Sequence, residues 1–230
     1  MVAENIQNIR ENIAKTCFRL GRDPQSVELI AVSKTFGSHH INEALASGIH
    51  DFGENYVQEL LEKKAGLEGK NVRWHFIGHL QSNKIKYLID WIYLIQSVDS
   101  ESVAAEIQKR AQSADKTMNV LVEVNTSEEA TKFGVKPNAA LGLIKKIALY
   151  PNINLKGLMT IGPFTDTKDE SRDAFKLLRT IFEEANRSGF LKGPMTILSM
   201  GMTHDYEIAI EEGSTMIRIG TAIFGSRTQQ

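Results

Sequence analysis

The chain has 230 residues, of which 42% are hydrophobic and 24% charged, and its formal net charge is −1. This composition is that of an ordinary globular protein, and the near-zero charge favours neither nucleic acid nor an anionic membrane as a general partner. Cys17 is the single cysteine, which excludes an intramolecular disulfide and a cysteine-based metal site. The sequence has neither a membrane-spanning apolar run nor the apolar core of a secretory signal, so we expect a cytoplasmic protein.

Apolar runs alternate with helix-periodic segments along the chain. A helix is predicted over Glu4–Leu20, and Gly21 and Pro24 end it. The first strand, Val27–Ser33, leads directly into Lys34. The further predicted strands are Ile49–Gly53, Val72–Ile77, Trp91–Gln96, Asn119–Val124, Leu155–Thr160, Thr196–Met200 and Thr215–Ile219. The predicted helices between them are Ile41–Ala46, Glu54–Lys64, Gln81–Leu88, Ser100–Ala111, Pro137–Leu149, Lys168–Arg187 and His204–Glu211.

Eight strands separated by helices predict parallel strands with right-handed crossovers, and therefore an α/β fold. The repeat favours a closed (β/α)8 TIM-type barrel, with an open doubly wound sheet as the alternative. Only about ten residues follow the eighth strand, so the N-terminal helix is expected to complete the outer helix ring. No low-complexity linker divides the chain, which predicts a single domain over residues 1–230.

Lys34 is the first candidate site residue, because the working face of such barrels lies at the carboxyl ends of the strands. Partial burial there would lower the pKa of its amine and let the neutral form attack an aldehyde as a Schiff-base lysine. The alternative is a structural lysine that pairs with Asp51 or Glu54.

A phosphate cup is predicted after the seventh and eighth strands, where this barrel type usually binds phosphate. Ser199 and Gly201 lie where the seventh strand closes, and Gly220 and Thr221 where the eighth closes. Glycine allows close approach of the backbone, and hydroxyls and N–H groups are phosphate donors, although short turns also need glycine for other reasons. Arg218 alternates with apolar neighbours, so it should face the barrel interior, bound to a ligand or in a structural salt bridge.

The remaining polar candidates lie at or near the same end of the barrel. Asn55, His79 and Asn83 are predicted to line the mouth. His75 and His79 have a His-x3-His spacing, but strand-to-loop geometry would separate them, so no metal site is predicted. His39 and His40 are predicted as solvated loop residues.

Several stretches together resemble the pyridoxal phosphate homeostasis protein family, whose members are relatives of the alanine racemase N-terminal barrel. The resemblance runs in order through nearly the whole chain. It rests on the stretches Ala31-Val32-Ser33-Lys34-Thr35, Gly53-Glu54-Asn55-Tyr56-Val57-Gln58-Glu59, His75-Phe76-Ile77-Gly78, Gly157-Leu158-Met159, Leu198-Ser199-Met200-Gly201-Met202 and Arg218-Ile219-Gly220-Thr221.

The resemblance implies pyridoxal 5′-phosphate (PLP) as the cofactor, held as a Schiff base on Lys34. It implies Ser199, Gly220 and Thr221 as phosphate ligands with Gly201 close by, and Arg218 as the arginine facing the pyridine nitrogen. The chain departs from the family pattern at Phe36-Gly37, where proline is common, and at Thr203-His204, where serine and a carboxylate are common.

The sequence favours a PLP carrier or reservoir over an enzyme. An arginine beside the ring nitrogen disfavours its protonation and weakens the electron sink that PLP catalysis needs. The chain is also expected to lack the additional C-terminal domain from which racemases take a second acid/base group. The alternatives are a PLP-dependent racemase-type enzyme and a Schiff-base aldolase, and the expected state is a monomer that passes PLP to apo-enzymes.

Overall fold

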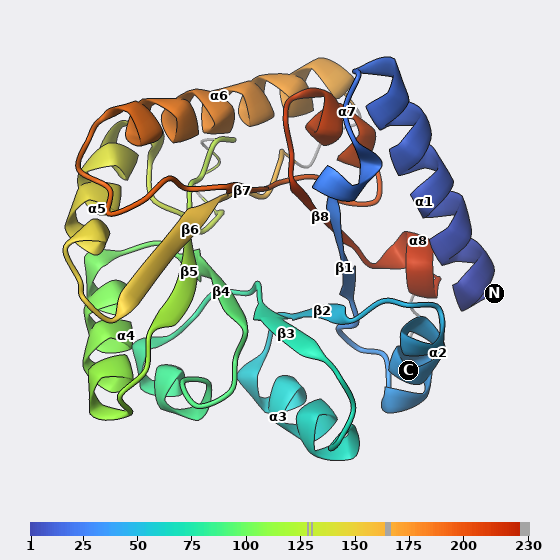
Figure 1. Cartoon of the computed structure of the whole chain (residues 1–230), viewed down its shortest axis with the longest axis horizontal. Coiled ribbons are helices and arrows are strands. Elements are labelled where there is room, and N and C mark those ends of the chain that lie inside the picture. The colour runs from blue at the N-terminus through green and yellow to red at the C-terminus, as the bar shows by residue number, and fades with distance from the viewer. Residues whose placement is uncertain (128, 130, 164–166, 226–230) are drawn as a thin grey trace.

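Eight parallel strands close into a barrel in the order β1 to β8, with β8 hydrogen-bonded back to β1. The structure is a computed structural model, which describes residues 1–127, 129, 131–163 and 167–225. Helices surround the barrel on its outside (Figure 1). The predicted (β/α)8 architecture is therefore confirmed, and the open doubly wound sheet is excluded.

The strands are short, as expected for a small barrel. They are β1 (Glu28–Val32), β2 (Asp51–Glu54), β3 (Arg73–Phe76), β4 (Leu94–Val98), β5 (Met118–Glu123), β6 (Ile153–Met159), β7 (Ile197–Ser199) and β8 (Met216–Ile219). The α-helices are α1 (Val2–Arg19), α2 (Ser38–Ala46), α3 (Val57–Gly66), α4 (Glu101–Ser113), α5 (Pro137–Ala148), α6 (Lys168–Arg187), α7 (Tyr206–Glu211) and α8 (Thr221–Phe224). Two short 3₁₀ helices complete the set, η1 (Pro24–Ser26) and η2 (Ser82–Tyr87).

Alternate residues of each strand face two different cores. The outward-facing side chains pack with the helices into one large apolar layer. A small second cluster, Ile30, Leu94, Leu121, Met159 and Met216, fills the middle of the barrel. The barrel is therefore a packed core and not a pore, so only its ends offer room for a ligand.

The N-terminal helix completes the outer ring, as predicted. α1 packs against α2, α7 and the short α8, and it runs alongside α7 and α8 in Figure 1. Its buried stripe includes Ile6, Ile9, Ile13 and Cys17. None of the helices among the described residues has an apolar stretch long enough to cross a bilayer.

Most element boundaries shift by a few residues from the sequence prediction, as the differences at β2, α3, η2 and β4 illustrate. β2 continues to Glu54, so α3 begins at Val57 and not at Glu54. The segment predicted as a helix at Gln81–Leu88 is the 3₁₀ helix η2, and β4 begins at Leu94 and not at Trp91.

The placement of His39 and His40 in a solvated loop is wrong. Gly37 caps α2, which therefore starts at Ser38 and includes both histidines. His39 is exposed on this helix, whereas His40 is half-buried against the rings of Phe36 and Phe224.

Candidate functional site

Lys34 lies just beyond the end of β1 and is half-buried, whereas the preceding Ser33 is fully buried. Asp51 and Glu54, the carboxylates that a structural lysine would pair with, are bound by other groups. Asp51 is held by Arg73 and His75, and Glu54 accepts hydrogen bonds from Ser33 and Lys63.

A buried cation fixes the backbone on the N-terminal side of Lys34. The ammonium of Lys63, on α3, donates to the carbonyl oxygen of Ser33 at 2.6 Å and to Oε1 of Glu54 at 2.6 Å. Burial raises the pKa of Glu54, although Lys63 opposes that rise. The second oxygen of Glu54, Oε2, is buried with no hydrogen-bond partner among the described residues.

The same cation also fixes the C-terminal side of Lys34. Lys63 donates to Oε1 of Glu59 at 2.8 Å, and that oxygen accepts the backbone N–H of Thr35 at 2.5 Å. Thr35 has φ of 71°, a left-handed conformation that a β-branched residue rarely adopts without support. The peptides on both sides of Lys34 are therefore held in a defined geometry by one buried ammonium.

The turn after β8 lies against the tip of β1. A Cβ on Gly220 would come within 3.3 Å of the carbonyl oxygen of Val32, two residues before Lys34. The structure therefore brings the lysine strand beside part of the predicted phosphate cup.

The two halves of the predicted cup are bonded to each other. The backbone N–H of Arg218 donates to the carbonyl of Gly201 at 3.0 Å, and that of Ala222 donates to Oγ1 of Thr203 at 3.4 Å. Gly201 has φ of +96°, and a Cβ there would lie 2.5 Å from Cβ of Ala209, so packing against α7 alone requires this glycine. Thr221, at the start of α8, is exposed.

Arg218 faces the barrel interior, as predicted. Its guanidinium is buried and donates to Oγ of Ser199 at 2.6 Å and to the carbonyl oxygen of Thr160 at 2.7 Å. No ion pair to Arg218 is found within the part of the chain that the structure describes. Burial lowers its pKa to about 10, partly offset by Glu123 and Asp205, so the group remains charged at neutral pH. The Ser199 hydroxyl is fully buried inside the barrel beside this arginine, and whether it also reaches a phosphate stays a prediction.

A hollow of about 600 Å³ opens at the mouth on the side of β2, β3 and β5, and its lining includes neither Lys34 nor the residues of the predicted cup. Asn55 and His79 contribute to its lining, as do Gln81 and Lys84 of the β3–β4 connection, whereas Asn83 is exposed on η2 and does not line the hollow. His79 stacks on the ring of Phe133, with centroids 3.8 Å apart.

Gly78 allows the loops after β2 and β3 to meet at this hollow. A Cβ on Gly78 would lie 2.2 Å from the carbonyl oxygen of Asn55, which no side chain could tolerate without a backbone shift. Asn55 and His79 therefore lie next to each other along the rim.

Glu123, at the end of β5, is a site residue that the sequence did not reveal. It lines the hollow although it is almost fully buried. Burial raises its pKa to about 7, the negative charge of Asp99 adds to the rise, and Arg218 opposes it. The carboxyl group can therefore take up or release a proton near neutral pH.

The two histidines of the His-x3-His spacing have different surroundings. His75 is fully buried inside the barrel with Asp51, whereas His79 lies at the mouth, 3.4 Å from Asp99. Among the described residues no group of three or more histidine, cysteine, aspartate or glutamate side chains is placed to hold a metal ion.

Comparisons with known proteins first show the broad class of protein to which the chain belongs. The sequence model of the family described as "Alanine racemase, N-terminal domain" matches residues 5–228. An alanine racemase from Clostridium difficile has the same fold at a TM-score of 0.74 with 15% identity, where the chain covers 58% of that enzyme.

Closer relatives define the branch. A protein of Aquifex aeolicus named pyridoxal phosphate homeostasis protein is 42% identical over 97% of both chains. PipY of Synechococcus elongatus, solved with PLP bound, matches at a TM-score of 0.85 with 32% identity, covering 98% of this chain and 100% of PipY. The chain belongs to the pyridoxal phosphate homeostasis protein family.

Proposed function

We propose that this protein binds PLP at the barrel mouth through a Schiff base on Lys34 and serves PLP homeostasis by holding and releasing it. The observation that carries the proposal is the contact between the tip of β1 and the Gly220 turn, because it supports one site for the Lys34 amine and the predicted phosphate cup. The names of the relatives and the PLP bound to PipY point to the same ligand.

The residues at the mouth fit the chemistry of this ligand. PLP has an aldehyde for an amine, a phosphate for backbone and hydroxyl donors, and a ring nitrogen. We assign Lys34 to the aldehyde and Gly201, Gly220 and Thr221 to the phosphate. Ser199 is assigned to the same end of the site through Arg218, because its hydroxyl proton is donated to Gln96. Arg218 is assigned to the ring nitrogen, with Asn55 and His79 beside the ring.

Holding the cofactor is favoured over turnover by the charge of Arg218. When bound, PLP can act as an electron sink, which is strongest with a protonated ring nitrogen. A guanidinium that stays charged at neutral pH opposes a second positive charge beside it. Arg218 therefore weakens the sink and leaves reversible binding of the aldehyde as the principal chemistry.

A PLP-dependent racemase-type activity is the second candidate, and Glu123 is the observation in its favour. A carboxyl group with a pKa near 7 beside the hollow is suited to move a proton. Rapid exchange of the Cα hydrogen of an enantiopure amino acid in deuterated water would favour this candidate. Absence of exchange on a fully loaded protein would exclude it.

We further propose that residues 1–230 act as one domain, as a cytoplasmic monomer that supplies PLP-requiring apo-enzymes. The word homeostasis in the names of the relatives supports a role in cofactor supply. Light scattering over a range of concentrations tests the monomer, and reactivation of an apo-enzyme through a dialysis membrane, compared with direct mixing, tests direct transfer.

A titration of the apoprotein with PLP, followed by visible absorbance, tests the binding proposal. One equivalent should saturate the protein, and Lys34→Ala should lose the absorbance band of the imine. Pyridoxal, which lacks the phosphate, should bind at least about 100-fold more weakly, because charge-assisted hydrogen bonds to the phosphate are lost. Equal affinity for the two ligands, or an unchanged band in Lys34→Ala, would overturn the proposal.

A further inference from the structure

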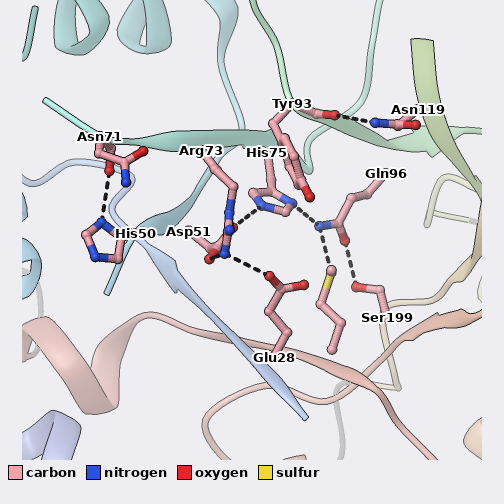
Figure 2. A network of polar contacts seen from close by, with 11 residues as sticks. Glu28, His50, Asp51, Asn71, Arg73, His75, Tyr93, Gln96, Asn119 and Ser199 are labelled. Atoms are coloured by element: carbon pink, nitrogen blue, oxygen red, sulfur yellow. Dashed lines mark hydrogen bonds and ion pairs between the residues drawn. The ribbon is translucent and has the colours of Figure 1, made fainter. Parts of the chain in front are cut away.

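A continuous chain of buried polar side chains runs through the barrel from Arg218 to its floor, the end where the strands begin. Arg218 donates to Oγ of Ser199 at 2.6 Å, and Oγ of Ser199 donates to Oε1 of Gln96 at 2.6 Å. Nε2 of Gln96 lies 3.0 Å from Nδ1 of His75, and Nε2 of His75 lies 3.0 Å from Oδ1 of Asp51. Figure 2 shows this chain from Ser199 to Asp51.

The direction of these hydrogen bonds is fixed at the Arg218 end. A guanidinium only donates, so the Ser199 oxygen accepts from Arg218 and its single proton goes to Gln96. The amide oxygen of Gln96 therefore faces Ser199, and its NH2 group faces His75. Because Nδ1 of His75 must then accept, the ring proton lies on Nε2 and points to Asp51.

A second contact supports the same orientation of Gln96. Its Nε2 also lies 3.2 Å from the sulfur of Met216, which can only accept a hydrogen bond. In Figure 2 a dashed line joins the amide nitrogen of Gln96 to the ring of His75. A flipped amide would place its oxygen against the sulfur, which is an acceptor, and burial makes such a contact costly.

The chain ends at the floor on a carboxylate that is itself held in place. Nε of Arg73 donates to Oδ1 of Asp51 at 2.6 Å, and Nη2 of Arg73 lies 3.2 Å from Glu28. The hydrogen bonds from His75 and Arg73 outweigh burial and hold the pKa of Asp51 below its usual range. Asp51 therefore stays ionised and accepts hydrogen bonds at the floor of the barrel, opposite the mouth.

We propose that Gln96 and His75 are positioning residues for the cofactor site, because they orient the Ser199 hydroxyl as the acceptor that holds Arg218. This inference rests on the proposed function, since Arg218 is the group assigned to the pyridine nitrogen. The chain makes the position of the guanidinium depend on residues at the opposite end of the barrel. Gln96, His75 and Asp51 need not touch the ligand.

The ring tautomer of His75 tests the direction of the chain without any cofactor. In apoprotein labelled with 15N-histidine, the nitrogen shifts should show a protonated Nε2 and an unprotonated Nδ1 for His75. In Gln96→Glu the new carboxylate cannot donate, so Nδ1 should gain a proton. A wild-type ring with its proton on Nδ1 would overturn the proposal.

The second test compares two buried glutamines. Gln108, on α4, makes two hydrogen bonds through its side chain, both to Asn152. Gln96→Leu should shift the visible absorbance of bound PLP and weaken PLP binding about tenfold, as expected when a charged group loses a hydrogen-bonded support. Gln108→Leu should lower the melting temperature but leave both PLP readouts unchanged.

The outcomes separate this proposal from the function on which it rests. If the wild type binds PLP but Gln96→Leu behaves like Gln108→Leu, the positioning role is wrong and the binding proposal stands. If the wild type binds no PLP, the proposed function fails, and the His75 tautomer still decides the direction of the chain. Loss of PLP binding equally in both variants would assign Gln96 a merely structural role.

Discussion

The two ends of the barrel treat buried carboxylates in opposite ways. At the floor, Asp51 is surrounded by donors from Arg73 and His75, and its pKa is lowered despite burial. At the mouth, burial raises the pKa of Glu123 to about 7, with Arg218 only partly opposing the rise. Asp51 is thus fully paired at the floor, whereas at the mouth Glu123 lines a hollow of about 600 Å³ with a pKa that burial raises. This contrast is what a ligand site at one end of a barrel requires.

Lys63→Met should cause the largest loss of stability among these variants, because it would leave the buried Glu54 carboxylate without its cation. Removing one partner of a buried pair destabilises a protein by about 3–5 kcal/mol, and both side chains are nearly inaccessible here. Urea unfolding of the apoprotein measures this loss, and borohydride trapping of PLP should also slow as the peptides around Lys34 lose their support.

Two controls accompany that variant. Adding Glu54→Gln should restore part of the lost stability, because the unpaired charge is removed. Lys146→Met breaks an exposed ion pair with Glu101 and should leave the free energy of unfolding close to that of the wild type. Equal losses in Lys63→Met and Lys146→Met would contradict the account.

Asp51→Asn should weaken the floor by about 2–3 kcal/mol at pH 7, since charge-assisted hydrogen bonds are lost from a buried group. Because the folded-state pKa of Asp51 is lowered, its stabilisation is present above the unfolded pKa and disappears as pH falls through the folded one. Urea unfolding at several pH values should therefore show a smaller acid-induced loss in the variant. Asp90→Asn, at an exposed pair with Lys116, is the control that should behave like the wild type.

Glu123→Gln should have the opposite pH dependence. Between the usual glutamate pKa and about 7, folded Glu123 keeps a proton that the unfolded chain has released, so stability falls as pH rises through that window. The variant lacks this penalty and should be more stable than the wild type by roughly 3 kcal/mol at pH 8. The two proteins should be alike near pH 4.5. Parallel stability curves for the two proteins across this range would show that folding does not raise the pKa of Glu123.

Gly220→Ala should have the smallest effect on stability, less than about 1 kcal/mol, because the new Cβ contacts Val32 at 3.3 Å and needs no left-handed backbone. Its effect should fall on the ligand, with several-fold weaker PLP binding as the methyl group enters the cup. Gly142→Ala, on α5 with nothing within 4 Å, is the matched control and should leave PLP affinity unchanged. An unaltered PLP affinity in Gly220→Ala would remove Gly220 from the cup.

The sequence predicted the barrel, the role of α1 and the inward direction of Arg218, because each depends on local periodicity. The sequence did not predict the residues whose contacts depend on strands that are distant in the chain. Lys63 reads as part of a charged helix surface, yet it is buried because β2 continues to Glu54 and brings that carboxylate to it. Glu123 and Gln96 carry no local signal, since their partners depend on the register of strands far apart in the chain.

The most direct test of the central claim is to locate the amine that captures the cofactor. The apoprotein is mixed with one equivalent of PLP, reduced with borohydride, digested, and the modified peptide identified by mass spectrometry. The account predicts a single pyridoxyl adduct on Lys34. A principal adduct on another lysine at the mouth, such as Lys84 or Lys132, would contradict it.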